Sequence, residues 1–254
     1  MNKYIFISVN YGTSGIIKDW IDSINKCYTG NKEFIIVDNY KSEEERKTIE
    51  KLSVKLRFHL IKSDNIGYGA GLNKGLYYAE NELNLKNAII FAGNLDLEYK
   101  NIPQNLNGKY VYVPRVLEGT RNRNPFLTKL QHKITSIYKF AAKYKISYIY
   151  YMVIIINKLV GFIPSKIWAV HGSLFCFNLS ILDKNEMLFN ENSFLYGEEL
   201  EFASFMHSKG ILFKDSEIIV EHSSHVCTKE VNDSTQKFLD LWSPSFLNWD
   251  KRWN

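Results

Sequence analysis

Short apolar runs alternate with helix-like segments over residues 4–99, and each run ends in polar side chains. The runs are "YIFISVN" (4–10), "EFIIVDN" (33–39), "LRFHLIKS" (56–63) and "NAIIFAGNLDLEY" (87–99). Continuous apolarity over so few residues is typical of strands that are buried on both faces of a parallel sheet. We therefore expect an α/β fold in which a doubly wound, mainly parallel sheet is flanked by helices.

The polar ends of these runs mark the expected ligand-binding edge. In an open α/β sheet, ligands bind outside the carboxyl ends of the strands, so the side chains at that position are candidates for binding. Those that follow or end the runs are Asn10, Asp38, Asn65, Asn94 and Asp96.

A glycine-rich stretch, "NIGYGAGLNKG" (65–75), follows the third run. The dinucleotide pattern G-x-G-x-x-G fails in both frames, and no G-K-[ST] of a Walker A loop occurs. What remains is a tight backbone with few Cβ atoms, flanked by Asn65 and Asn73. Such a backbone would let a flat base or a ribose lie close to Gly67 and Gly71.

Composition narrows the setting of the protein. The net charge of +5 permits anionic partners but does not demand nucleic acid. Cys27, Cys176 and Cys227 lie far apart without a C-x-x-C pair, which favours free thiols in a reducing compartment. The apolar start is too short for a signal peptide, and no uncharged apolar run is long enough to span a bilayer. We therefore expect a cytoplasmic protein without a spanning helix.

The second half of the chain is less regular. A strand is expected at 109–116, and lysines lie off an apolar stripe at 126–163, which predicts a helical insertion. A strand and turn at 169–182, a helix within 189–211 and a strand at 216–224 follow. The expected organisation is one domain, 1–254, with a nucleotide-binding half (1–100), an acceptor and catalytic half (101–225) and a tail (226–254).

Seven short motifs between residues 4 and 225 together carry a family resemblance. In order they are "VNYG", "IIVDN", "NIGYGAGLNKG", "NLD", "HGSLFCFNLSIL", "FLYGEELEF" and "VEHSSH". This series resembles the family 2 glycosyltransferases of the GT-A fold, particularly the rhamnosyltransferase-like branch that builds bacterial surface polysaccharides such as capsule or O-antigen. The resemblance implies inverting transfer of a sugar from a nucleotide-diphosphate sugar to a glycan or a lipid-linked glycan, without a nucleic-acid partner.

The resemblance also implies roles for individual residues around the donor. Asp38 would accept a hydrogen bond from the base, and Asn10, Tyr11 and Asn65 would complete the base and ribose pocket. The remaining donor contacts would be Gly67, Gly71, Asn73 and Asn94.

Asn94 and Asp96 stand where the family carries its metal-binding D-x-D. The resemblance implies a divalent cation, Mn²⁺ or Mg²⁺, that bridges the diphosphate and stabilises the leaving group. Asn94 departs from the strict motif, and a neutral first ligand lowers the charge at the site. His222 matches a histidine that completes the metal site in some relatives.

The "YGEE" stretch matches the acidic pair whose second member is the general base in the family. That position is Glu199, with Glu198 as the competing candidate, while Gly172 of "HGS" lies on the acceptor side. Direct displacement needs one carboxylate to take the proton of the acceptor hydroxyl. Acids at the start of a helix are also favourable as caps, and both roles are compatible.

Several alternatives remain open. The basic, aromatic stretch 126–163 could pack on the domain as a hairpin, form a homodimer contact, or lie on the inner membrane leaflet as a peripheral anchor. A sugar nucleotidyltransferase would share the α/β architecture, but "NYGTSGIIKD" lacks the basic glycine loop expected after its first strand. A catalytically inactive nucleotide-sugar-binding subunit has the Asn94 substitution as its sequence support.

Overall fold

The computed structural model describes residues 2–133, 165–191 and 194–223, together with 143, 144, 148, 152, 155, 156, 159, 160 and 163. Its first half contains β1 (Lys3–Asn10), η1 (Ser14–Ile16), α1 (Ile17–Cys27), β2 (Lys32–Asn39), α2 (Glu43–Leu56), β3 (His59–Ser63), α3 (Tyr68–Asn81), β4 (Ala88–Gly93) and β5 (Leu97–Asn101). Its second half contains β6 (Tyr110–Glu118), β7 (Arg121–Asn122), β8 (Leu127–Thr128), α4 (Lys129–His132), β9 (Ile167–Ala169), β10 (Leu174–Asn178), η2 (Leu179–Ile181), α7 (Glu198–Ser208) and β11 (Leu212–His222).

One large mixed sheet organises the described residues, in the order β3-β2-β1-β4-β10-β6-β11-β5, with β7 paired to β6. Strands β3, β2, β1 and β4 are parallel, as the alternating apolar runs predict. The sheet changes direction at β10, which runs antiparallel to both β4 and β6. Strand β11 is parallel to β6 but antiparallel to β5. The expected α/β class with a mainly parallel sheet is confirmed, with antiparallel strands in its second half.

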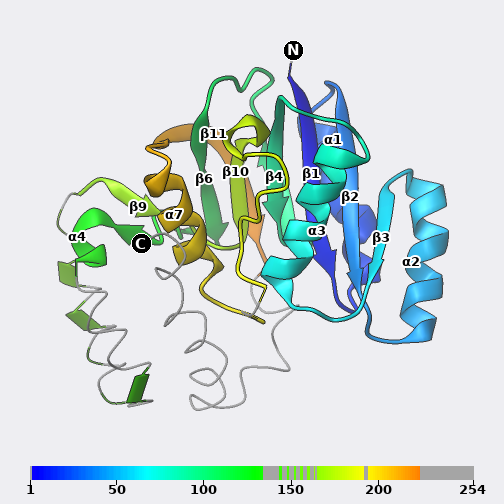
Figure 1. Ribbon diagram of the computed structural model, residues 1–254, viewed down its shortest axis with the longest axis horizontal. Coiled ribbons are helices and arrows are strands. Elements are labelled where there is room, and N and C mark those ends of the chain that lie inside the picture. The colour runs from blue at the N-terminus through cyan, green and yellow to red at the C-terminus, as the bar shows by residue number, and fades with distance from the viewer. Residues whose placement is uncertain are drawn as a thin grey trace.

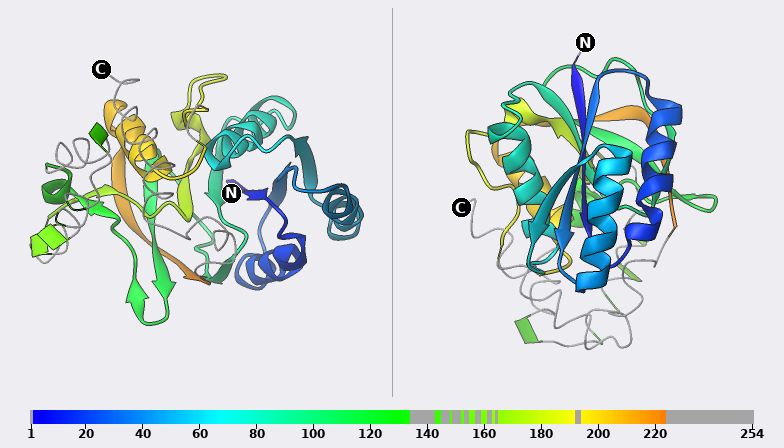
Figure 2. Two further views of the ribbon diagram at one scale, coloured as in Figure 1. Left: turned by 90° about the horizontal axis from the view of Figure 1, so that it is seen from below. Right: turned by 90° about the vertical axis from the view of Figure 1, so that its right-hand side faces the viewer.

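Helices cover the two faces of the sheet, and a core fills each side (Figures 1 and 2). On one face α1 packs through Trp20, Ile21 and Ile24, and α2 contributes Ile49. On the other face α3 and α7 pack against a second apolar cluster. Because both faces are covered, β1 and β4 are buried along almost their whole length, which explains why their sequences are continuously apolar.

Local sequence signals set the start of α2 and the close packing of α3 against the sheet. Ser42 caps α2, since its hydroxyl accepts a hydrogen bond from the Glu45 N–H at 3.2 Å. Helix α3 lies close to the sheet at Gly75, where a side chain would meet Ile7 Cγ2 at 2.4 Å. A glycine inside a helix costs about 1 kcal/mol relative to alanine, and close packing against β1 offsets that cost.

Two expected elements differ from the observed ones. The run at 87–99 divides into β4 and β5, which separate at "NLD" and join different neighbours in the sheet. The helical insertion expected at 126–163 begins instead with β8, which pairs with β9 and is followed by the short helix α4. Much of 134–164 lies outside the described residues, as do Cys227 and the tail at 226–254. Cys27 and Cys176 are free thiols.

Where the chain is described, no helix is both long enough and apolar enough to cross a membrane.

Candidate functional site

The carboxyl ends of β1, β2 and β4 meet at one edge of the sheet, the lower edge in Figure 1. Parallel pairing places Asn10 of β1 directly opposite Asp38 of β2. Strand β4 is joined to β1 near this edge by Ser8, whose hydroxyl donates to the Gly93 carbonyl at 2.6 Å. The sheet therefore brings the predicted donor-binding residues and the "NLD" motif to the same side of the molecule.

Asp38 is the centre of a network of hydrogen bonds in which each of its carboxylate oxygens has a partner. It is 1% exposed, and its Oδ1 accepts a hydrogen bond from Asn10 Nδ2 at 2.9 Å. Its Oδ2 accepts from Arg46 Nε at 3.0 Å, and Arg46 also donates to the Ser63 carbonyl at 2.6 Å. Asn10 Oδ1 in turn accepts from the backbone and hydroxyl of Thr13. Each carboxylate oxygen keeps a lone pair for a further donor, so the network orients Asp38 without blocking it.

Two aromatic rings stand beside this network at the solvent. Tyr11 follows β1 and Tyr40 follows β2, and both are exposed. The Arg46 guanidinium lies 4.7 Å from the centroid of the Tyr40 ring. Lys41 Nζ lies 5.4 Å from the centroid of the Tyr11 ring. Exposed rings beside a buried carboxylate offer a flat surface and a hydrogen-bond acceptor together, which is the combination that a nucleobase needs.

The glycine-rich stretch packs against protein atoms. A side chain at Gly67, where φ is +94°, would meet the Phe194 carbonyl at 2.4 Å, and one at Gly71 would meet Val9 at 2.8 Å. Asn73 is buried and exchanges hydrogen bonds with the backbone of Leu188 and Phe189. The expected close approach is thus made by the fold itself, and donor contact by these three residues stays a prediction.

Asn65 is exposed on the rim of this edge, in the loop between β3 and α3.

The "NLD" motif meets the end of β11. Asp96 is 8% exposed, and its Oδ1 lies 3.3 Å from His222 Nε2 without a well-formed hydrogen bond to any described residue. His222 Nδ1 lies 3.2 Å from Glu118 Oε1, and Glu118 also binds Arg123. Asn94 is half-buried, and its N–H donates to the Ser173 carbonyl at 2.9 Å. Long-range pairing of β11 with β5 and β6 assembles this cluster.

The neighbouring carboxylates favour the protonated form of His222 as long as no cation is bound. Burial lowers the pKa of His222, but Asp96 and then Glu118 outweigh burial, so the net pKa is raised. Burial lowers the pKa of neighbouring His171 to about 4, and the charge of His222 adds to that shift. The two imidazole rings are 5.8 Å apart, and His171 Nδ1 lies 2.8 Å from Ser173 Oγ. The pKa values of the two histidines are thus shifted in opposite directions, and His171 is neutral near pH 7.

The two predicted acids of "YGEE" point to different surroundings. Glu199 faces the turn before β10, because a methyl group on Gly172 would lie 2.9 Å from Glu199 Oε2. Glu198 is buried towards α3, where its Cγ would lie 3.4 Å from a methyl group on Gly69. The turn before α7 sets this divergence, with φ of +72° at Tyr196 and +95° at Gly197.

Burial raises the pKa of both acids. The pKa of Glu198 rises to about 8, first through burial and then through the charge of Glu199, and its Oε1 has no hydrogen-bond partner among the described residues. Burial raises the pKa of Glu199 to about 7, and the charge of Glu201 adds to the rise. A carboxylate with a pKa near 7 is well matched to general-base catalysis at neutral pH.

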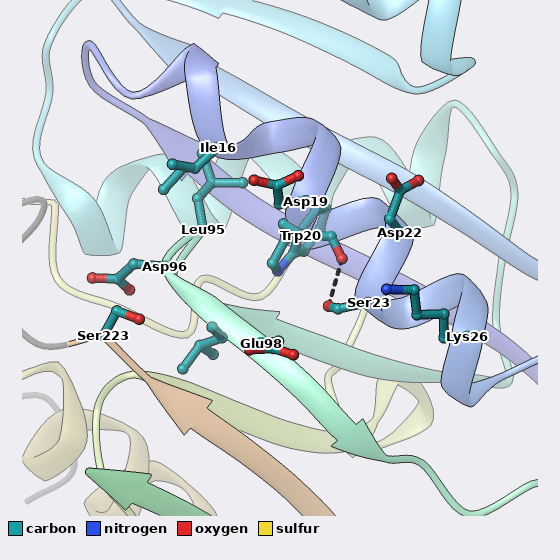
Figure 3. Close-up of a pocket in the computed structure, with 11 residues that line it drawn as sticks. Ile16, Asp19, Trp20, Asp22, Ser23, Lys26, Leu95, Asp96, Glu98 and Ser223 are labelled. Atoms are coloured by element: carbon teal, nitrogen blue, oxygen red, sulfur yellow. Dashed lines mark hydrogen bonds between the residues drawn. The ribbon is translucent and has the colours of Figure 1, made fainter. Parts of the chain in front are cut away.

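A cavity of about 430 Å³ lies between α1 and β5, and Asp96 is one of its lining residues (Figure 3). Its acidic lining residues are Asp19, Asp22, Asp96 and Glu98, and Lys26 is its single cation. Such a lining repels an anionic diphosphate, so we do not place a donor there.

The residues around Asp96 fit a cation that the donor itself helps to hold. Among the described residues, no group of three or more His, Cys, Asp and Glu side chains forms a ready metal site. Asp96 Oδ1 and His222 Nε2 are nevertheless adjacent, and the first is buried without a hydrogen bond. Mg²⁺ in nucleotide sites is commonly bound through one or two protein carboxylates, with substrate phosphates and water as the remaining ligands.

Three residues that sequence reasoning missed belong to this site. Arg46 lies on α2, where no site residue was expected, yet it pairs with Asp38. Glu118 ends β6 and pairs with His222, and Arg123 supports Glu118 from the following turn. The position of Glu118 at a strand end was the available signal, since the carboxyl ends of parallel strands gather at one edge.

Comparison with known proteins gives one curated relative and several similar folds. No family model matches the chain. It is 25% identical to the low-salt glycan biosynthesis hexosyltransferase Agl10 of Haloferax volcanii, covering 92% of this chain and 72% of that protein. The structure of S. aureus TarS covers 98% of this chain at 14% identity, with a TM-score of 0.56, and this chain spans 43% of it.

Two further structures were solved with a nucleotide or a nucleotide-sugar bound. The mannosyltransferase PcManGT from Pyrobaculum calidifontis, in complex with GDP-Man and Mn²⁺, has a TM-score of 0.54 at 10% identity and covers 99% of this chain and 73% of its own. Glucosyl-3-phosphoglycerate synthase from Mycobacterium tuberculosis, in complex with UDP, has a TM-score of 0.51 at 11% identity and covers 98% of this chain and 79% of its own. These likenesses confirm the GT-A fold implied by the resemblance to family 2.

Proposed function

We propose that this chain, a glycosyltransferase of the GT-A fold, moves one sugar from a nucleoside diphosphate to a glycan hydroxyl with inversion at the anomeric carbon. The observation that carries the proposal is the position of Glu199. Its carboxylate lies against Gly172, at 2.9 Å from where a Cβ atom would stand, and both residues are partly exposed, so an acceptor hydroxyl could reach it from the turn before β10. A single carboxylate in that position suits direct displacement, which requires one base and no second acid.

In the proposed reaction, an acceptor hydroxyl attacks the anomeric carbon. A new carbon–oxygen bond forms while the bond between that carbon and the diphosphate oxygen breaks. The hydroxyl proton passes to Glu199, and the bonding electron pair leaves with the nucleoside diphosphate. Glu198 plays no part in this transfer, since its carboxyl is buried towards Gly69 on α3.

At the donor end, Asp38 would receive a hydrogen bond from the base, held in place by Asn10 and Arg46. Tyr11 and Asn65 would complete the base and ribose pocket from the rim. Asp96 and His222 would hold a divalent cation, assisted by Asn94. When bound, such a cation would offset the negative charge that develops on the departing diphosphate.

We further propose a role in building a surface glycan, with a glycan or a lipid-linked glycan as acceptor. Support comes from the curated relative, whose name places it in glycan biosynthesis. The single-domain organisation over 1–254, with its nucleotide and acceptor halves, is part of the same proposal. The common direction of the parallel strands β1, β2 and β4 supports the assignment of the donor to the first half.

Calorimetric titration with uridine, guanosine and thymidine diphosphates, each with and without Mn²⁺, tests the donor site directly. One nucleotide should bind most tightly, and Mn²⁺ should strengthen its binding. Asp96→Asn should remove the Mn²⁺ effect, whereas Glu98→Gln, two residues further on in β5 and lining the cavity, should leave it unchanged. Absence of binding to every nucleotide would overturn the proposal, and binding without any sugar transfer would favour an inactive donor-binding subunit.

A further inference from the structure

Large apolar side chains recur on the outside of segment 143–163. Tyr144, Tyr148, Met152, Ile155, Leu159 and Ile163 are each between 44% and 72% exposed. All but the last are in helical conformation. We call these six residues the apolar face.

The spacing of the apolar face follows one side of a helix. Successive members are separated by four, four, three, four and four residues. At roughly 100° per residue, these positions fall within an arc of about 100°, which is the width of one apolar stripe. Ile156 and Val160, which directly follow two members, are only half-buried rather than exposed. Among the described residues of this segment, the exposed apolar side chains therefore lie on one stripe.

The surroundings of the apolar face are strongly cationic. Between Glu118 and Asp183 the chain carries nine of its 32 Lys and Arg residues and none of its 27 acidic residues. Lys129, Lys133, Lys143 and Lys166 are described and exposed. Lys143 Nζ lies 5.3 Å from the centroid of the Tyr144 ring, so charge and aromatic surface occur side by side.

We propose that the apolar face docks on an anionic lipid bilayer, with the surrounding lysines at the level of the headgroups. Apolar side chains of a surface helix enter the boundary between headgroups and acyl chains, while tyrosine and lysine favour the interface itself. Each lysine or arginine near an anionic surface strengthens the attraction.

Charge favours a bilayer over a second copy of this chain. A two-fold contact between copies would place the same cation-rich surface against itself, where like charges repel. An anionic bilayer meets both properties of the surface at once, since it offers apolar depth and negative headgroups. In Figure 1 and in the right-hand view of Figure 2, the described parts of this segment also lie low in the molecule, on the side to which the carboxyl ends of β1 and β4 point. Docking would thus hold the site near lipid-linked acceptors, although the proposal does not depend on the donor chemistry.

Co-sedimentation of the whole chain with phosphatidylglycerol or phosphatidylcholine vesicles tests the proposal without any substrate. The chain should bind the anionic vesicles, and added salt should weaken that binding because it screens the headgroups. The variant Tyr148→Ser/Ile155→Ser/Leu159→Ser should lower partitioning into the vesicles about tenfold or more, since three apolar side chains that would enter the bilayer are lost. The matched control Val54→Ser/Met187→Ser/Leu212→Ser removes exposed apolar residues elsewhere and should bind like the parent.

A second pair of variants tests the charges. Lys129→Glu/Lys133→Glu/Lys143→Glu should abolish the preference for anionic vesicles, whereas Lys47→Glu/Lys51→Glu/Lys55→Glu on α2 should keep it. Circular dichroism should show every variant folded, as expected for exposed positions. Failure of the parent to bind anionic vesicles, or equal loss in both serine variants, would overturn the proposal. A parent dimer that the first serine variant converts to monomer, without vesicle binding, would assign the apolar face to a second copy instead.

Discussion

The two ends of the candidate site differ in how their buried charges are satisfied. At the donor end, both carboxylate oxygens of Asp38 accept hydrogen bonds, from Asn10 and Arg46. At the catalytic end, Asp96 Oδ1 and Glu198 Oε1 are buried without a well-formed hydrogen bond among the described residues. A satisfied network fixes one geometry, whereas an unsatisfied buried acid is available for a proton, a cation or a substrate.

The same difference appears in the titration of the acids. Burial raises the pKa of Glu198 to about 8 and that of Glu199 to about 7. Perturbed acids of this kind gather where chemistry occurs, while saturated ion pairs serve positioning. We therefore propose that the Asp38 network orients the donor and that proton transfer takes place at the start of α7.

Replacement of the base should have the largest effect. Glu199→Gln should lower sugar transfer by about 10²–10⁴, the usual contribution of a positioned base, with donor affinity unchanged. The rate of the parent should rise with pH through about 7, because Glu199 must lose its proton to act. Transfer assays at saturating donor measure both. An inactive Glu198→Gln beside an active Glu199→Gln would move the base by one position.

Loss of the buried acid at the "NLD" motif should come next. Asp96→Asn, or excess chelator on the parent, should lower transfer about 100-fold, since a cation contributes several kcal/mol at a developing charge. Metal-dependent transfer assays, with Glu98→Gln as the matched control, test this. Full activity of the parent in chelator would refute the metal assignment.

The titration of Glu198 should be visible in stability. Its folded pKa of about 8 exceeds its ordinary value of 4.5, so the folded state keeps a proton that the unfolded state releases. The free energy of unfolding should therefore be highest below pH 4.5 with respect to this group, and should fall as pH rises towards 8. In Glu198→Gln, this fall in the free energy of unfolding should be smaller by about 1–3 kcal/mol. Glu199 contributes a fall of the same sign, so part of the fall should remain in the variant. Urea unfolding at both ends of this pH range measures it, and an unchanged slope would contradict the assignment.

The smallest effect should come from the donor end. Arg46→Met leaves Asp38 with one partner fewer and should lower the free energy of unfolding by about 1–2 kcal/mol. Nucleotide affinity should fall several-fold, because Asp38 loses a group that orients it. The control Lys47→Met replaces an exposed neighbour on the same helix and should change neither quantity. Equal effects of both variants would mean that the comparison between the two ends fails.

Much of the fold followed from local sequence. Continuous apolar runs identified the parallel strands, and helix-like segments were expected between them, where α1, α2 and α3 lie. The sequence did not reveal the antiparallel placement of β10 and β5, or the short strand β8 at the start of the expected helical insertion. Strand direction and pairing depend on contacts between distant segments, which no local pattern records.

The site was predictable to the extent that it uses strand ends. Asp38 and Asp96 were found because polar residues that end buried strands are unusual. Arg46 and Glu118 were missed because their partners come from other elements, 8 and 104 residues away. A charge on a helix gives no indication of its partner until the helix is packed on the sheet.

The sequence by itself determined the α/β class, the sheet edge that gathers the polar strand ends and the presence of an acidic pair at the start of α7, since these follow from hydrophobic pattern and residue type. Only the tertiary structure decided which acid faces the open turn at Gly172 and which is buried. Adjacent side chains at a helix start point in different directions, and the left-handed turn at Tyr196 and Gly197 sets which direction each one takes. The chemical identity of a side chain is local, but its environment, and hence its pKa, is made by chain segments that folding brings together.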